Sequence, residues 1–168
     1  MLPTALAHPD AARIATAVGI FSSGLFAGFS LGLSAIALPA LLAGAHSSDK
    51  NILPPMFARL YRRGARAAVP LAAISTLALG YSSAAHFSGG ADTEGWMLAV
   101  AAAACGGAVP FTLTVMKKNI STLIKASEEG GLDIEEQVKE LVKWMRLNFV
   151  RGSGPLLGFV LTLCAAFW

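Results

Sequence analysis

Charged residues are scarce in this sequence. Asp, Glu, Lys and Arg make up 14% of its 168 residues, whereas hydrophobic residues make up 55% and the mean hydropathy is positive. This excludes an ordinary soluble domain, in which about 25% of residues are charged. Four stretches contain no charged residue at all: 14–48, 67–91, 95–116 and 152–168. Because a spanning helix needs about 20 apolar residues, these stretches predict an integral membrane protein.

The predicted fold class is all-α, a four-helix transmembrane bundle that forms a single membrane domain, 1–168. The expected spans are 14–43, 67–87, 95–116 and 147–168. The first apolar stretch is far longer than the apolar part of a signal peptide, and further spans follow it. We therefore expect a retained membrane anchor rather than a cleaved leader.

Cysteine and histidine are also scarce. Cys105 and Cys164 lie within expected spans and form no CxxC motif, which excludes a disulfide framework and a thiol redox centre. His8, His46 and His86 lie at a chain end or in loops, and they are not paired across helices as haem ligation requires. No cluster of carboxylates and histidines suited to iron occurs either. The sequence therefore predicts neither a metal site nor a bound cofactor.

Basic residues concentrate in the two segments that join spans one to two and three to four. These residues are Lys50, Arg59, Arg62, Arg63 and Arg66, and Lys117, Lys118, Lys125, Lys139, Lys143 and Arg146. The positive-inside rule places both segments in the cytosol and both termini across the membrane. Contact with anionic headgroups of the lipid bilayer then explains the net charge of +3 without nucleic acid.

Glycines recur in the first span at Gly24, Gly28 and Gly32. Small residues at this spacing let another helix approach closely, so the stripe predicts tight helix packing. The neighbouring helix belongs either to the same chain or to a second copy. A homo-oligomer formed through this stripe is therefore an open alternative.

Prolines mark where helices begin or bend. The pair at 54–55 is expected to open a short interfacial helix, which Gly64 would end before the second span. In the third span, Pro110 follows two glycines and should kink the helix. The hydroxyl of Thr112 or Thr114 is expected to satisfy a carbonyl that the kink frees, and the kink itself could shape a cavity.

The third and fourth spans are expected to extend into the cytosol as a helical hairpin. The Glu-Glu-Gly-Gly segment at 128–131 should break the first of these helices. Asp133 and Glu136 have the spacing of a capping box, which would start the second helix.

A polar stripe precedes the last apolar run. Trp144, Asn148 and Arg151 are spaced i, i+4 and i+7 and so share one helical face. Counting back about 20 residues from the C-terminus puts the membrane boundary near Asn148, with Arg151 about one turn inside. Snorkelling would explain an isolated arginine, but the aromatic ring and the amide favour a polar pocket. The same count puts Asn119 at similar depth, and this set suits a flat apolar ligand with an oxygen that becomes negative.

Four blocks of the sequence resemble the fungal-type anthrone oxygenase family, four-helix integral membrane proteins of polyketide biosynthesis. In family order, they are SGLFAGFSLGLSAIALPALL, LYRRGARAAVP, VPFTLTVMKKNISTL and ELVKWMRLNFVRGSGPLLG. The last two are the most specific, because they combine Pro-Phe-Thr and Asn with Trp, Asn and Arg at helical spacing. The chain departs from the family at Lys117 and Lys118, where Pro-Thr is frequent, and at Ala65, where His is frequent.

The resemblance implies an oxidoreductase of secondary metabolism, a cofactor-independent monooxygenase that converts a polyketide-derived anthrone to an anthraquinone with O2. The anthrone would first lose a proton. Arg151, Asn148 and Asn119 are then expected to stabilise the negative oxygen of the anthranolate, and Trp144 is expected to stack on its rings.

Further contacts with the substrate are expected from Tyr61, Thr112 and Pro110. Tyr61 and His46 are the candidates for the base that removes the proton, and the sequence does not choose between them. For such a multi-pass protein we expect the endoplasmic reticulum membrane, with both long loops cytosolic.

Two other function classes fit a four-helix membrane protein. A small multidrug transporter is disfavoured, because proton-coupled export needs a carboxylate within the membrane and no expected span contains Asp or Glu. A noncatalytic four-helix membrane scaffold, in which the polar stripe only packs the cytosolic hairpin, remains the alternative to an enzyme.

Overall fold

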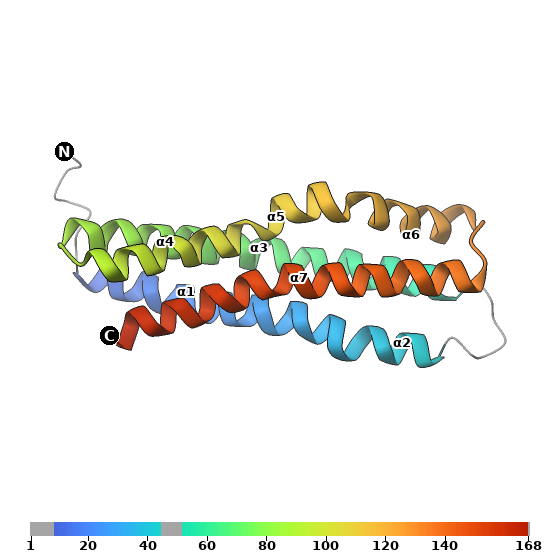
Figure 1. Cartoon of the computed structure of the whole chain (residues 1–168), viewed down its shortest axis with the longest axis horizontal. Helices are drawn as coiled ribbons and strands as arrows, with labels where there is room; N and C mark the ends of the chain where they lie inside the picture. Colours follow the sequence, from blue (N-terminus) through green and yellow to red (C-terminus); the bar gives the residue numbers. More distant parts are fainter. Residues whose placement is uncertain (1–8, 45–51, 168) are drawn as a thin grey trace.

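The computed structural model describes residues 9–44 and 52–167, whose regular elements are all helical. They form four long rods (Figure 1). The first rod comprises α1 (Pro9–Gly32), a π-helical segment (Leu33–Ala37) and α2 (Leu38–Gly44), and the second is α3 (Leu53–Ser88). The third comprises α4 (Asp92–Gly106), α5 (Ala108–Phe111), a π-helical segment (Thr112–Met116) and α6 (Lys117–Glu129), and the fourth is α7 (Ile134–Phe167). The predicted all-α fold class is confirmed.

Each rod is long and apolar enough to cross a membrane, which confirms the predicted four-helix transmembrane bundle. The candidate spans are Asp10–Ala43, Leu53–Ser88, Asp92–Glu129 and Ile134–Phe167. A bilayer core of about 30 Å accommodates about 20 helical residues, because a helix rises about 1.5 Å per residue. The 36 residues of α3 and the 34 residues of α7 therefore project well beyond the hydrocarbon.

The rods run alternately up and down, so that α1 begins at the end of the bundle where α7 finishes (Figure 1). Helix α3 packs against α1 and α4, and α7 packs against the same two helices. The largest cluster of buried apolar residues lies toward the opposite end of the bundle and includes Phe57, Met116, Leu123, Leu141 and Trp144. The polar stripe on α7 therefore faces the interior.

The expected interfacial helix is not a separate element. Its two prolines do occupy the first turn of α3, as predicted, but the helix continues through Gly64 to Ser88. The prediction that Gly64 ends a helix is therefore wrong. Gly64 is buried, and a Cβ added there would lie 3.5 Å from the Phe29 ring. A Cβ at that distance would make only ordinary van der Waals contact, so Gly64 neither ends the helix nor is required for the packing of α3 against α1.

The bend predicted around Pro110 is present. Helix α4 ends at Gly106, and α5 continues into a π-helical segment before α6 begins. The Thr112 hydroxyl donates to the Ala108 carbonyl at 2.7 Å, and the Thr114 hydroxyl donates to the Pro110 carbonyl at 2.8 Å. Both hydroxyl groups thus bond to carbonyls of the bent segment, but the Ala108 carbonyl also accepts the Thr112 backbone N–H and is not one that the kink frees. As a result, the third rod steps outward at α5 (Figure 1).

The helical hairpin at the far end also forms as predicted. Gly130 and Gly131 adopt positive φ angles of 76° and 93°, which stop α6. The Glu136 amide donates to Asp133 Oδ1 at 2.8 Å, and the Asp133 amide donates to Glu136 Oε2 at 3.3 Å. This reciprocal pair is the capping box that starts α7. Whether the hairpin lies in the cytosol stays a prediction.

The glycine stripe of α1 is used only in part within this chain. A Cβ at Gly24 would lie 3.1 Å from the Phe159 ring of α7, whereas a Cβ at Gly28 or Gly32 would meet nothing within 4 Å. Gly24 therefore serves the predicted tight packing. The other two face open space, and the homo-oligomer stays a prediction.

The contact between α4 and α7 should depend strongly on Gly154. A Cβ at Gly154 would lie 2.7 Å from the backbone oxygen of Ala104, and backbone cannot move aside as a flexible side chain can. We expect Gly154→Ala to lower the free energy of unfolding by about 1–3 kcal/mol. Titration of SDS into mixed micelles, followed by circular dichroism, measures this change.

Gly80→Ala is the matched control, because Gly80 lies inside α3 and a Cβ there meets nothing within 4 Å. Alanine is the better helix former by up to about 1 kcal/mol, so this variant should be neutral or slightly stabilised. Equal stability of the two variants would contradict the close packing of α4 and α7.

Candidate functional site

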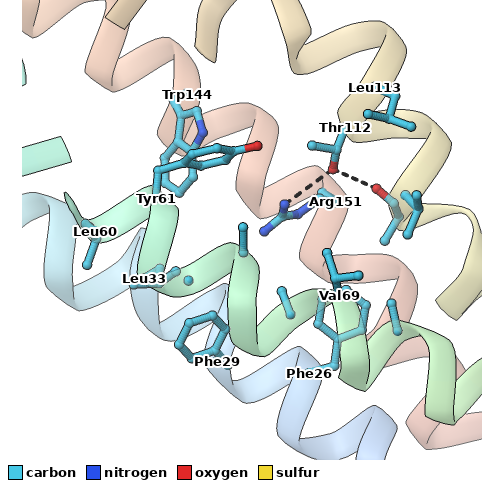
Figure 2. Close-up of a pocket in the computed structure, with 16 residues that line it drawn as sticks. Phe26, Phe29, Leu33, Leu60, Tyr61, Val69, Thr112, Leu113, Trp144 and Arg151 are labelled. Atoms are coloured by element: carbon cyan, nitrogen blue, oxygen red, sulfur yellow. Dashed lines mark hydrogen bonds between the residues drawn. The ribbon is translucent and has the colours of Figure 1, made fainter. Parts of the chain in front are cut away.

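A cavity of about 140 Å³ lies inside the bundle and is bordered by α1, α3, α5 with its π-helical extension, and α7 (Figure 2). Most of its wall is apolar: Phe26, Phe29, Leu33, Leu60, Ala65, Ala68, Val69, Ala72, Ala108, Val109 and Leu113. Four residues bring polar atoms to this wall, namely Tyr61, Thr112, Trp144 and Arg151. The cavity therefore suits an apolar ligand that carries a small polar group.

Arg151 is the charged member of the cavity lining. Its Nη2 donates to Asn148 Oδ1 at 2.5 Å, and its Nη1 donates to Thr112 Oγ1 at 3.3 Å. Its Nε is buried and has no hydrogen-bond partner. Both acceptors are neutral, and within residues 9–44 and 52–167 no carboxylate pairs with this guanidinium. An anionic ligand would supply the charge that the protein itself does not.

Asn148 holds Arg151 in place from behind. The side chain is fully buried, and its Nδ2 donates to the Ser30 carbonyl and to Ser34 Oγ, both at 2.8 Å. Its Oδ1 accepts from Arg151, and Asn148 does not line the cavity. We had expected Asn148 to contact the substrate oxygen directly. Its position instead makes it a residue that orients the guanidinium.

Trp144 forms one wall of the cavity and is 2% exposed. Its ring packs edge-on against Phe57, with ring centroids 5.2 Å apart, and Phe57 in turn stacks on Tyr61 at 5.9 Å. The Trp144 Nε1 is buried and has no hydrogen-bond partner. In Figure 2 the hydroxyl of Tyr61 points toward the side of the cavity that Arg151 and Thr112 occupy. These aromatic residues belong to a packed core and are therefore held rigidly.

Two residues expected at the site lie away from it. Asn119 is buried in α6, where its Nδ2 donates to the backbone oxygen of Glu140 at 3.0 Å and to Glu140 Oε2 at 2.5 Å. It therefore joins the two helices of the hairpin and does not line the cavity. Pro110 is exposed and bends the third rod without forming part of the wall. His46, the second candidate base, lies outside the described residues.

Some residues of the site were not predicted as such. Asn148 is held by the backbone carbonyl of Ser30 and by the hydroxyl of Ser34. The available signal was the hydroxyl of Ser34 within an apolar span, whereas a backbone carbonyl carries no sequence signal. Ala65 also lines the cavity. The family frequently has histidine at this position, so this departure from the family lies at the cavity wall.

The polar side chains of this site are an arginine, an indole and two hydroxyl groups, of which the Thr112 hydroxyl already donates to the Ala108 carbonyl. Among the residues that the structure describes, no three His, Cys, Asp or Glu side chains lie together as metal ligands would. A guanidinium beside apolar walls is an arrangement that can stabilise an oxygen anion.

Fold and cavity together define a bundle of four membrane-length rods with a buried cation beside an apolar cavity. The family model described as "Anthrone oxygenase" matches residues 57–161, which include Trp144, Asn148 and Arg151. The chain belongs to the anthrone oxygenase family, as its sequence blocks suggested. It is therefore an oxygenase, an oxidoreductase of the membrane.

Curated relatives are similar over most of their length. The anthrone oxygenase tpcL of Aspergillus fumigatus is 30% identical over 152 residues, which cover 89% of this chain and 91% of the relative. The anthrone oxygenase ptaC of Pestalotiopsis fici is 32% identical over 144 residues, covering 81% and 99%. A noranthrone monooxygenase of Aspergillus flavus is 28% identical over 149 residues, covering 86% and 69%. No solved structure matches this chain.

Proposed function

We propose that this protein converts a polyketide-derived anthrone to an anthraquinone with O2, at the Arg151 cavity and without a bound cofactor. One observation carries the proposal. Two residues that line a mostly apolar cavity, Arg151 and Trp144, each carry a buried hydrogen-bond donor without a partner, Nε and Nε1 respectively. An unsatisfied buried donor costs about 1–3 kcal/mol. A flat ligand with a negative oxygen would satisfy both donors and the apolar wall at once.

The first step is loss of the benzylic proton of the anthrone. The resulting anthranolate carries its negative charge largely on the ring oxygen, which would lie beside the Arg151 guanidinium. At about 4 Å and an effective dielectric constant of about 20, two opposite charges attract by roughly 4 kcal/mol. Since about 1.4 kcal/mol corresponds to a factor of ten, the guanidinium would favour proton loss by roughly three orders of magnitude.

The phenolate form of Tyr61 is the proposed acceptor of this proton, which it returns to the peroxide formed in the next step. It is the one candidate base that the structure describes, and it lines the cavity with its hydroxyl directed toward the side of Arg151 (Figure 2). Proton transfer by a positioned side chain contributes about 10²–10⁴-fold to rate. Stacking of Phe57 on Tyr61 restricts how that side chain can move.

The substrate itself then reacts with O2. The electron-rich anthranolate reduces O2, and a carbon–oxygen bond forms at the deprotonated carbon to give a peroxide anion. This anion takes back the proton held by the base and becomes a hydroperoxide. Loss of the remaining hydrogen on that carbon breaks the O–O bond and releases water. One oxygen atom thus enters the quinone and the other leaves as water, so that anthrone and O2 yield anthraquinone and water.

The direct test uses purified protein in liposomes with a model anthrone under air and a metal chelator. We expect quinone absorbance to rise with one O2 consumed per quinone formed, and ¹⁸O2 to label one quinone oxygen. A requirement for added flavin or iron would overturn the cofactor-free chemistry. Absence of turnover under all these conditions would favour the noncatalytic scaffold.

The indole N–H of Trp144 should matter apart from its ring. Trp144→Phe keeps an aromatic wall against Phe57 but removes the unpaired donor. We expect kcat/KM to fall about tenfold, because a hydrogen bond to a charged group is worth about 1.5–3 kcal/mol. Steady-state quinone formation measures this change. Trp96→Phe is the control, since Trp96 is 66% exposed and lies outside the cavity, and an equal fall in both variants would contradict the role.

The setting of this reaction is also a proposal. We place the protein in the endoplasmic reticulum membrane with both long loops cytosolic. The basic residues of those loops support this orientation through the positive-inside rule.

A further inference from the structure

The Arg151 cavity has a lateral mouth. Val69, Val109 and Leu113 line the cavity, yet they are 58%, 40% and 63% exposed. Side chains that border a cavity and the outer surface together mark where the cavity opens. Val69 belongs to α3, and the other two belong to α5 and its π-helical extension. The mouth is therefore a window between the second and third rods.

The bend of the third rod creates this window. On one side of it, α4 lies close to α3, since a Cβ at Gly106 would be 3.1 Å from Thr76 Oγ1. On the other side, α6 returns to α3, where Arg62 and Glu128 form an ion pair of 2.8 Å. Between these contacts the third rod steps outward at α5 (Figure 1). The π-helical segment and the glycines before Pro110 thus hold two adjacent rods apart at the level of the cavity.

The window lies at the depth of hydrocarbon. Val109 and Leu113 precede Lys117, the first charged residue of this rod after its apolar run, by eight and four residues. At about 1.5 Å per residue, they lie roughly 6–12 Å inside the level of that lysine. The three residues of the mouth are all aliphatic, so an apolar ring crosses it without displacing a charged group. An anthrone dissolved in lipid has direct access there.

A second route runs along α6. A groove shares Tyr61, Thr112 and Leu113 with the cavity wall and continues past Lys117, Ser121 and Lys125. A ligand that arrived from water would pass between hydrated lysines in this groove. The lateral window avoids those lysines and is favoured for a ligand that partitions into the bilayer.

We propose that the anthrone reaches Arg151 sideways from the bilayer, through the window framed by Val69, Val109 and Leu113. This inference rests on the proposed function for the identity of the ligand. It makes the three aliphatic residues determinants of substrate access, separate from the groups that act on the bound substrate.

The test variant, Val109→Phe, narrows the window. The control variant, Val100→Phe, makes the same change on the same rod. Val100 is 49% exposed and does not line the cavity. In proteoliposomes, Val109→Phe should lower kcat/KM about tenfold, because access limits association. Ser121→Phe, which narrows only the groove along α6, should match wild type within about twofold. A larger fall for Ser121→Phe than for Val109→Phe would overturn the lateral route.

Two further measurements separate access from chemistry. Each variant is loaded with anthrone without oxygen for a long period, and oxygen is then added. In Val109→Phe, the rate of this single turnover should fall far less than kcat/KM does, because loading is complete before oxygen is added. Association without turnover is followed as quenching of Trp144 fluorescence by anthraquinone, with Trp144→Phe as the blank, and Val109→Phe should slow it. Slowed association in a protein without turnover would overturn the proposed function and leave the route standing, whereas unchanged association would overturn the route.

Discussion

Replacement of Arg151 by leucine should lower kcat/KM for anthrone oxidation by at least about 10²–10³-fold, which is the usual loss when one donor to a developing oxyanion is removed. Arg151 is the charged side chain on the cavity wall, and its hydrogen-bond acceptors are neutral. Its charge is therefore free to balance that of an anthranolate. Leucine restores an apolar wall but offers nothing to a negative oxygen. Quinone formation in microsomes, normalised to folded protein, measures the loss.

Arg146→Leu provides the matched control for this experiment. Arg146 lies on the same helix but is exposed and does not line the cavity, so the same chemical change there should leave kcat/KM within about twofold of wild type. Arg151→Lys should fall between the two, because lysine keeps the charge without the planar set of donors. An active Arg151→Leu enzyme would remove the basis of the proposed mechanism.

Asn148→Ala should give the second largest effect. The change removes the acceptor for Arg151 and both donations to the first rod. We expect kcat to fall about 10–100-fold, because a guanidinium displaced by about 1 Å stabilises the anthranolate less well. KM should change much less, since the apolar wall that binds the rings is intact. Steady-state kinetics that separate kcat from KM check this prediction.

Asn119→Ala distinguishes positioning from folding. Asn119 is also buried, at 2% exposure, and also joins two helices, but it lies outside the cavity. Both alanine variants should lose roughly 1–3 kcal/mol of unfolding free energy, whereas only Asn148→Ala should lose rate. In a double-mutant cycle, Asn148→Ala should add little to Arg151→Leu, because both act through one guanidinium. Independent, additive losses would contradict the positioning role.

Local signals in the sequence predicted much of this architecture. The apolar stretches predicted the rods, and the spacing of Asp133 and Glu136 predicted a capping box. Each of these features depends on residues within a few positions of one another. The shared helical face of Trp144, Asn148 and Arg151 was predicted by the same short-range geometry. These features need no knowledge of which helix lies opposite.

Features that depend on a distant partner were predicted less well. Gly64 was predicted to end a helix, but it lies inside α3, where it is buried beside Phe29 of another helix. Asn119 and Asn148 have the same side chain and similar expected depth. Asn119 forms a hydrogen bond with Glu140 across the hairpin, whereas Asn148 forms hydrogen bonds with Ser30 and Arg151. Neither partner is visible in the local sequence.

Insertion into the membrane, the number of rods and the face of α7 that carries the polar stripe follow from the sequence, because hydrophobic transfer and helical periodicity act along one segment at a time. The packing of the rods decided the rest. It placed Asn148 outside the cavity in contact with Arg151, buried one unpaired donor each on Arg151 and Trp144, and formed a cavity lined by residues of α3 and α5. Each of these outcomes depends on distances between side chains far apart in the chain, and such distances exist only once all four rods are assembled.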